Sequence, residues 1–530
     1  MSKKIRNLNK KIRKWISRNR WEAFWLTLVL VVGAILRLYK IDGYMTFLGD
    51  EGRDAIIVRR LLVDFDPILI GPGTSIGNMY LGPLYYYMMA PFLLIFNFSP
   101  AGPAVGVALL GVLTIWLVWY VGRTWFGKLP ALVAAFLFTI SPAVITYSRS
   151  SWNPNIMPFF SLLAIYAVWK FWAKREYKWL VVTGVSIAAT LQSHYLALLL
   201  VPIGGIFWLI TLVRSGRNIR ELLKYSAWSL IAFSLLMSPL VMFDARHGWI
   251  NFASVRKFFT ERQTTVSAKP WNALPKLDHV VERVSQALIH PTNTTAPKVI
   301  IVIFLLTLVW LAFKLLTSDR SEKLKLNIHG FWKRFNSAKL SPYVLLMTWL
   351  ATAVFGLGVY KQEIYAHYYG FFFTGVFLLI GAFIAILQSF KSKYWLVGTL
   401  LIVGFVAYIQ LQTNPLRYPP NNQLGRTAEV ADKMIEISDG ELFNIAVIAE
   451  RNYEGAYQYF LEREDANFVV IDSQREETVA DQLIVVCELP KDKCDPVHND
   501  KAEVANFGWS AIEKEHSVAG VTIYKLIHTK

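Results

Sequence analysis

Long apolar runs repeat along the first four-fifths of the chain and constrain its fold more than any other feature. A bilayer crossing needs about 20 mostly apolar residues. The sequence offers such runs near 21–40, 81–98, 103–122, 131–147, 156–173, 178–193, 196–213, 226–243, 298–316, 341–359, 366–388 and 394–411. Charged residues make up only 17% of the chain, a share typical of a membrane protein. We therefore expect an α-helical polytopic membrane protein.

Basic connectors between the runs indicate how the chain is threaded. They lie at Arg123–Lys128, Lys174–Lys178, Arg214–Lys224, Arg320–Lys339 and Lys391–Lys393. Cytoplasmic loops are enriched in Lys and Arg, and all five connectors lie inside only if 81–98 does not cross. That segment is short, aromatic and interrupted by Pro83 and Pro91, which favours a helix at the outer interface. The prediction is about eleven crossings.

The two ends of the chain differ in charge. Residues 1–20 carry nine Lys or Arg and no acid, and the next run lacks a small-residue cleavage site, which indicates a retained signal anchor with a cytoplasmic N-terminus. Residues 412–530 hold 12 basic and 21 acidic residues, against 43 and 16 in residues 1–411. This uneven distribution argues against nucleic-acid binding. We expect a membrane domain at 21–411 and an extracytoplasmic soluble domain at 412–530, in the plasma (inner) membrane.

Alternating helix and strand patterns in the tail predict a compact α/β domain. Strands are expected at 443–449, 467–472, 482–489 and 521–527, with a helix at 454–464. Both cysteines, Cys487 and Cys494, lie in this domain. An outside location permits a disulfide, but the spacing leaves two free thiols as an equal alternative.

A charged stretch, "LGDEGRDAIIVRRLL", follows the first crossing. The threading places it in a long first external loop, 41–102; a second long external loop spans 244–297. Apolar residues at helical spacing after Asp50 and Glu51 predict a surface helix. Carboxylates near a helix N-terminus interact favourably with its dipole, so the pair is interpreted either as a cap with a solvated face or as a general base or metal site at the membrane interface.

The order of these features resembles a known family. A crossing, the charged stretch, a Pro/Gly-rich segment and "YLGPLYYYMMAPF" resemble the first external loop of the GT-C glycosyltransferases, in particular the dolichyl-phosphate-mannose–protein mannosyltransferase family, which includes bacterial lipid A aminoarabinose transferases. The resemblance covers most of 20–411. It implies a GT-C fold with interfacial helices in the first external loop. It also implies that Asp50 is the catalytic base, that Glu51 is its neighbour and that Arg53 lies near the donor phosphate.

The implied chemistry is transfer of a sugar from a polyprenyl-phosphate donor to a protein, lipid or glycan acceptor. A carboxylate within hydrogen-bond reach can remove the acceptor's proton as it attacks the anomeric carbon. The phosphate is already a good leaving group, so it needs cations rather than an acid. A single displacement inverts the anomeric configuration. No cofactor is implied with certainty.

The second external segment, "SRSSWNPNIMPFF", offers Arg149, Asn153 and Asn155. Family members often carry an acidic residue here, and its absence weakens a two-carboxylate site for a divalent metal. The two asparagines are candidates for binding sugar hydroxyls, and Arg149 is grouped with them. The alternative is a Pro/Asn helix cap.

Other outer-surface residues complete the candidate site. His194, Lys361, His367, Tyr368 and Arg246 are candidates for the donor phosphate or prenyl chain, and Tyr80 for the sugar or acceptor. The alternatives are an interfacial or core histidine for His194, an aromatic belt with a snorkelling lysine for the 361–369 turn, and interface chemistry for Arg246.

Two other classes of protein compete with a glycosyltransferase. A transporter or lipid flippase typically carries ionisable residues within the membrane and related halves, whereas these runs are nearly free of charge and show no repeat. A non-catalytic membrane scaffold is the third alternative, and it would tolerate the loss of Asp50.

Overall fold

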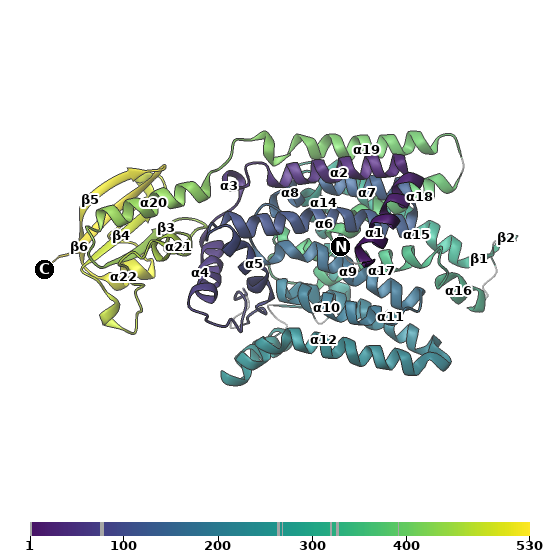
Figure 1. The fold of residues 1–530 in the computed structure, drawn as a ribbon, viewed down its shortest axis with the longest axis horizontal. Coiled ribbons are helices and arrows are strands. Elements are labelled where there is room, and N and C mark those ends of the chain that lie inside the picture. The colour runs from purple at the N-terminus through teal and green to yellow at the C-terminus, as the bar shows by residue number, and fades with distance from the viewer. Residues whose placement is uncertain are drawn as a thin grey trace.

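The computed structural model describes residues 3–74, 79–261, 265–267, 269–318, 321–324, 328–390 and 392–529. Arg320 and Lys391, which begin two of the predicted basic connectors, lie outside this part of the chain. A helical bundle forms one part of an elongated molecule, and a small sheet domain forms one end of it (Figure 1). Helices α4 and α5 lie between these two parts.

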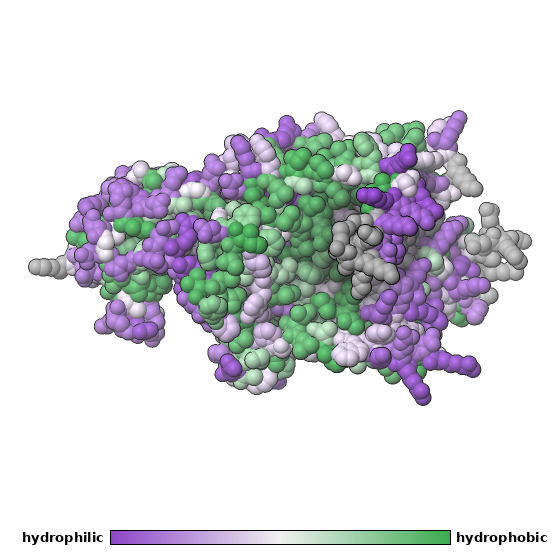
Figure 2. Space-filling model, in the orientation of Figure 1, coloured by the Kyte–Doolittle hydropathy of each residue, from purple (hydrophilic) through white to green (hydrophobic). Residues whose placement is uncertain are grey.

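The bundle contains the predicted crossings as helices. They are α2 (Arg20–Leu38), α6 (Ala101–Phe126), α7 (Lys128–Ile140), α9 (Met157–Ala173), α10 (Trp179–Ser193), α11 (Leu200–Ser215), α12 (Ile219–Arg246), α15 (Thr295–Leu316), α17 (Ser341–Val359), α18 (Phe373–Ser389) and α19 (Trp395–Gln412). Within the described residues, 7 helical segments are long and apolar enough to cross a membrane. The shorter apolar helices include α7, α10 and α18, so the number of crossings stays a prediction. An apolar surface covers the middle of the molecule between hydrophilic ends (Figure 2).

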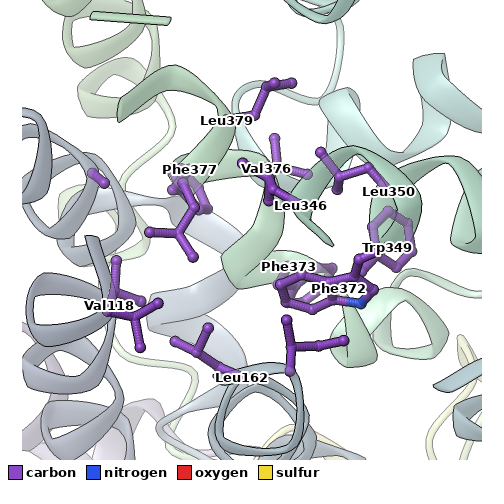
Figure 3. Packing of buried hydrophobic residues seen from close by; sticks show 14 of the residues in the cluster. Val118, Leu162, Leu346, Trp349, Leu350, Phe372, Phe373, Val376, Phe377 and Leu379 are labelled. Carbon is purple, nitrogen blue, oxygen red and sulfur yellow. The ribbon is translucent and has the colours of Figure 1, made fainter. Parts of the chain in front are cut away.

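Helix α18 lies in the core of the bundle. Its sequence is apolar on every face, which is typical of a helix surrounded by other helices. Phe373, Val376 and Phe377 of this helix are buried among Val118 of α6, Leu162 of α9 and Trp349 of α17 (Figure 3). This packing holds η5 (Ala366–Phe371), the turn that precedes α18, against the rest of the bundle.

The first external loop contains α3 (Ile41–Tyr44), α4 (Gly49–Val63) and α5 (Leu84–Ile95). Helix α5 has 12 residues with Pro91 inside it, which is too short to span about 30 Å of hydrocarbon and agrees with an interfacial helix. The remaining connections carry α1 (Lys3–Arg18), α8 (Pro142–Tyr147), η1 (Asn153–Ile156), η2 (Tyr195–Leu199), η3 (Gly216–Asn218), α13 (Ile250–Thr260), η4 (Pro270–Lys276), α14 (Leu277–Leu288), β1 (Thr317–Ser318), β2 (Ser321–Leu324) and α16 (Ile328–Phe335).

The C-terminal part is a four-stranded sheet with helices on both faces. Its elements are η6 (Pro415–Arg417), α20 (Gln423–Ile437), β3 (Phe443–Ile448), α21 (Gly455–Arg463), η7 (Glu476–Thr478), β4 (Gln482–Cys487), η8 (Lys491–Lys493), α22 (Ala502–Phe507), β5 (Ser510–Val518) and β6 (Val521–His528). The strand order is β3-β4-β6-β5, with β3 parallel to β4 and the other pairs antiparallel. Strands β3 and β4 are buried throughout, as continuous apolar runs predict.

Most of the predicted tail elements are confirmed, and one is wrong. Residues 467–472 form no strand; Phe468 makes only an isolated bridge to Phe443. Strand β5 has no apolar pattern that would predict it, because most of its side chains are exposed and three neighbouring residues, Glu513, Lys514 and Glu515, are charged. Cys487 and Cys494 form a disulfide, with their Cα atoms 6.3 Å apart, which decides between the two alternatives left open by the sequence.

Candidate active site

The N-terminus of α4 is held by two acceptors. The Glu51 carboxylate accepts the Leu48 N–H at 3.1 Å, and Asn452 Oδ1 of the C-terminal domain accepts the Gly49 N–H at 2.9 Å. Amide groups in the first turn of a helix have no partner within the helix, so these acceptors stabilise its start. The two neighbouring carboxylates therefore differ: Glu51 caps the helix, whereas Asp50 is free for other contacts.

Asp50 faces a cavity between the bundle and the C-terminal domain. Its Oδ1 accepts hydrogen bonds from Arg53 Nη1 at 2.9 Å and from the Tyr453 hydroxyl at 2.7 Å. Its side chain is 43% exposed and lines a cavity of about 200 Å³. Within the described part of the chain, both hydrogen bonds reach Oδ1, so Oδ2 remains available to accept a proton.

Arg53 joins two carboxylates. Besides the bond to Asp50, its Nη2 and Nε donate to Asp54 Oδ1 at 2.7 and 3.1 Å. Asp54 is fully buried and also accepts the Tyr86 hydroxyl at 2.9 Å. Burial raises the pKa of Asp54 to about 6, although the Arg53 charge lowers it. Arg53 is thus held at both ends of its guanidinium, and its role near the donor phosphate stays a prediction.

Glu51 is buried, and its carboxyl group makes the stability of the folded protein depend on pH. Burial raises its pKa from 4.5 to about 7, against the lowering effect of its backbone hydrogen bonds. The folded state therefore binds more protons than the unfolded state between these two values, so stability falls as pH rises through this window. Glu51→Gln keeps an oxygen for the Leu48 N–H and cannot ionise.

We expect Glu51→Gln to stabilise the protein at pH 8, by about 3 kcal/mol at most, and to have little effect near pH 4.5. Thermal unfolding at both pH values measures this difference. Glu429→Gln, at an exposed position of α20, is the matched control. Equal unfolding temperatures for Glu51→Gln and wild type at pH 8 would contradict a raised pKa.

Aromatic rings form one wall near Asp50. The His367 ring lies 4.2 Å from the Trp152 ring, and Trp152 lines the Asp50 cavity. The His194 ring lies 4.1 Å from Tyr368 and 6.1 Å from His367. Burial lowers the pKa of His367 to about 4 although the Asp50 charge raises it, so this ring is neutral at pH 7. The predicted residues His194, His367 and Tyr368 therefore share one cluster with Trp152.

Three predicted residues of the second external segment have different surroundings. Arg149 is buried, and it donates to the carbonyls of Leu36 and Tyr39 at 2.7 and 2.6 Å, so it caps the end of α2. Asn153 donates to the Ser193 carbonyl at 2.6 Å, so its amide binds the end of α10 and does not cap the helix that follows it. Asn155 lines the Asp50 cavity.

Tyr80, Arg246 and Lys361 lie on other elements. The Tyr80 N–H donates to Asn251 Oδ1 at 2.8 Å. Arg246 is exposed at the end of α12. The Lys361 N–H donates to the Thr265 carbonyl at 2.9 Å. The contacts described for Tyr80 lead to α12 and α13 rather than to Asp50.

The structure adds site residues that the sequence analysis did not single out. They are Asp54, Tyr86, Tyr147, Trp152, Arg451 and Tyr453. Asp54, Tyr86 and Trp152 lie within the quoted motifs, so those motifs could have indicated them. Arg451 and Tyr453 come from the C-terminal domain, and no local pattern marks them. Among the described residues, no group of three or more His, Cys, Asp or Glu is placed to hold a metal ion.

A long apolar groove lies in the bundle. It has a volume of about 650 Å³ and is lined by side chains of α14, α15, α17 and α18, among them Val281, Phe304, Leu350 and Val376. Phe372, which directly follows η5, also lines it. The groove therefore reaches the residue that directly follows the turn carrying His367.

Comparisons with known proteins agree with this architecture. Residues 81–243 match the family model for dolichyl-phosphate-mannose-protein mannosyltransferases, while no curated protein matches the chain in sequence. ArnT from Cupriavidus metallidurans in the apo state is similar over 96% of this chain and 98% of its own, at 12% identity and a TM-score of 0.53. The Archaeoglobus fulgidus oligosaccharyltransferase in complex with Zn and sulfate is similar over 87% of this chain and 67% of its own, at 15% identity and a TM-score of 0.54.

A second structure from the same organism, the oligosaccharyltransferase AglB in complex with an inhibitory peptide and a dolichol-phosphate, covers 89% of this chain and 70% of its own. Its identity is 14% and its TM-score 0.52. At such identities the likeness concerns the fold, and the family match concerns the segment from α5 to α12. The chain therefore shares the fold of these solved structures, and its residues 81–243 are similar to the dolichyl-phosphate-mannose-protein mannosyltransferases.

Proposed function

We propose that the protein is an integral-membrane glycosyltransferase that moves a sugar from a polyprenyl-phosphate donor to an acceptor at the extracytoplasmic face, with inversion at the anomeric carbon. The observation that carries the proposal is Asp50: a half-exposed carboxylate that is held by Arg53 and Tyr453 and lines a cavity. A general base must be both fixed in place and open to its substrate. Asp50 meets both conditions, whereas Glu51 and Asp54 are buried.

The apolar groove supports a lipid-linked donor. Its lining of aliphatic and aromatic side chains suits a prenyl chain, whose transfer from water is favourable in proportion to the apolar area buried. Phe372, which lines the groove, follows His367 by five residues, and the His367 ring contacts the cavity residue Trp152. A prenyl chain in the groove would therefore place its phosphate and sugar near the wall of the Asp50 cavity.

The proposed step is one displacement. The acceptor's nucleophilic oxygen, or another nucleophile, forms a bond to the anomeric carbon as its proton passes to Asp50 Oδ2. The bond from that carbon to the phosphate oxygen breaks, and polyprenyl phosphate leaves with the electron pair. Cations stabilise the charge that develops on the phosphate, and Arg451, which lines the cavity, supplies one. The neutral rings of Trp152 and His367 offer flat apolar surfaces to a sugar.

The position of basic residues at one end of the bundle supports an orientation in which the Asp50 cavity lies outside the cell. Arg123 near the end of α6 pairs with Glu22 near the start of α2 at 2.5 Å, so these two helix ends lie together, away from α4. Lys170 and Arg214 lie near the ends of α9 and α11, and Trp172 and Arg214 both contact Asn336. Basic residues favour the cytoplasmic side. The Asp50 cavity and the C-terminal domain would then be extracytoplasmic, in the plasma (inner) membrane.

A transfer assay tests the function. Wild-type protein in nanodiscs is given a panel of radiolabelled polyprenyl-phosphate sugars with membrane lipids, peptides and envelope glycans as acceptors. We expect transfer of one sugar, and NMR of the product should show the anomeric configuration opposite to that of the donor. Transfer from nucleotide sugars alone, or retention of configuration, would refute the proposal, as would no transfer from any lipid-linked donor.

A further inference from the structure

The C-terminal domain contacts the helix that carries Asp50 at very short range. A Cβ atom added at Gly52 would lie 2.3 Å from the Gly455 carbonyl oxygen, and one added at Gly455 would lie 2.5 Å from the Gly49 carbonyl oxygen. Any other residue at these positions would force the two backbones apart. Helices α4 and α21 therefore meet through glycine, and the closeness of the backbones fixes their relative position.

Polar contacts continue the same interface on both sides of the glycines. Asn452 binds the Gly49 N–H through Oδ1 and donates from Nδ2 to Glu488 at 2.6 Å. Glu488 also accepts the Tyr457 hydroxyl at 2.6 Å, and it lies in the turn closed by the Cys487–Cys494 disulfide. At the other end of α4, Arg60 pairs with Glu462 at 2.8 Å. The domain is thus attached to α4 at its first turn and near its last turn.

One side chain of this domain reaches the reacting carboxylate itself. The Tyr453 hydroxyl donates to Asp50 Oδ1 at 2.7 Å and accepts Arg53 Nη1 at 3.3 Å. Burial raises the pKa of Tyr453 above its usual value, so the hydroxyl keeps its proton and remains a donor. Because Tyr453 and Arg53 both engage Oδ1, they restrict rotation of the carboxylate and keep Oδ2 for the acceptor's proton.

From these contacts we infer that the C-terminal domain is part of the catalytic centre, and that Tyr453 is a positioning residue which orients Asp50 for proton transfer. The inference rests on the proposed function, because it assigns Tyr453 a role in that reaction. It gives the domain a function that its sequence does not indicate: the domain completes the active site, and an acceptor must reach Asp50 through a cavity whose wall includes Arg451 and Tyr453.

Tyr453→Phe removes one oxygen and keeps the ring that packs on Gly49. Losing a hydrogen bond to a charged group should lower kcat roughly 10- to 100-fold, with the KM for the donor and the unfolding temperature unchanged. Because the carboxylate loses a donor, the acidic limb of the pH–activity profile should move to higher pH. Tyr524→Phe, a buried tyrosine on the other face of the same sheet, is the matched control and should behave as wild type.

Hydrogen exchange of the full-length protein gives a second measurement that needs no substrate. Gly455→Ala should speed the exchange of the α4 amides between residues 50 and 53, because the added methyl group separates α4 from α21. Gly425→Ala, where a Cβ meets no atom within 4 Å, should not. Tyr453→Phe should speed the exchange of the same amides to a smaller extent.

These readouts separate two failures. If the wild-type protein transfers no polyprenyl-phosphate sugar, the proposed function is wrong. If, in addition, Gly455→Ala and Tyr453→Phe leave the hydrogen exchange of the α4 amides unchanged, the attachment of the C-terminal domain to α4 is refuted as well. If the wild-type protein is active and Tyr453→Phe keeps its kcat and its pH profile, the inference about Tyr453 is wrong while the proposed function stands.

Discussion

Asp50→Asn is expected to abolish most sugar transfer while leaving the fold intact. Asparagine keeps an oxygen in the position of Oδ1, so it can still accept hydrogen bonds from Arg53 and Tyr453. It cannot take up the acceptor's proton. Loss of a general base typically costs about 10²- to 10⁴-fold in rate, and we expect the effect on kcat with little change in the KM for the donor.

The measurement is single-turnover transfer in nanodiscs, together with thermal unfolding of the same sample. Asp66→Asn, in the exposed segment after α4, makes the same chemical change outside the cavity and should keep wild-type activity. If Asp50→Asn transfers sugar at the wild-type rate, the carboxylate is only part of the helix start, and the displacement proposed above would need another base.

The class of fold could be predicted from the sequence because hydropathy is a local signal. Each helix named above as a predicted crossing overlaps an apolar run, and strands β3, β4 and β6 coincide with buried apolar segments. The elements that the sequence does not predict are those whose hydropathy pattern does not match their structure. Strand β5 is mostly exposed and carries Glu513, Lys514 and Glu515, so it has no apolar pattern. Residues 468–471 are apolar, yet this segment lies along one edge of β3 through a single bridge.

The site residues could be predicted from the sequence only where they lie together in one short motif. Asp50 and Glu51 are conspicuous because a charged stretch follows a crossing, and the structure shows that their roles differ by burial. Arg149 and Asn153 show the limit, since a side chain that binds backbone carbonyls has the same sequence signature as one that binds a sugar. Tyr453 lies about 400 residues from its partner Asp50, and only the docking of two domains brings them together.

Arg53→Gln is expected to destabilise the protein more than any other change in this loop. It removes the cation that pairs with Asp54, whose carboxylate is fully buried. Leaving a buried charge without its partner typically costs about 3–5 kcal/mol, which thermal unfolding at pH 8 would show directly. The cost should shrink toward pH 5, because burial raises the pKa of Asp54 to about 6 and a protonated Asp54 no longer needs the cation.

A second substitution distinguishes a structural role of Arg53 from a catalytic one. Arg53→Gln with Asp54→Asn removes both charges, so the double variant should recover most of the lost stability while its transfer rate stays low, because Asp50 has lost one of its two hydrogen-bond donors. Arg60→Gln breaks an ion pair in which the arginine is 55% exposed, and such pairs contribute about 1 kcal/mol or less. If Arg53→Gln unfolds no earlier than Arg60→Gln, or if the double variant is no more stable than Arg53→Gln alone, the buried pair does not hold α4 in place and Arg53 acts on the substrate instead.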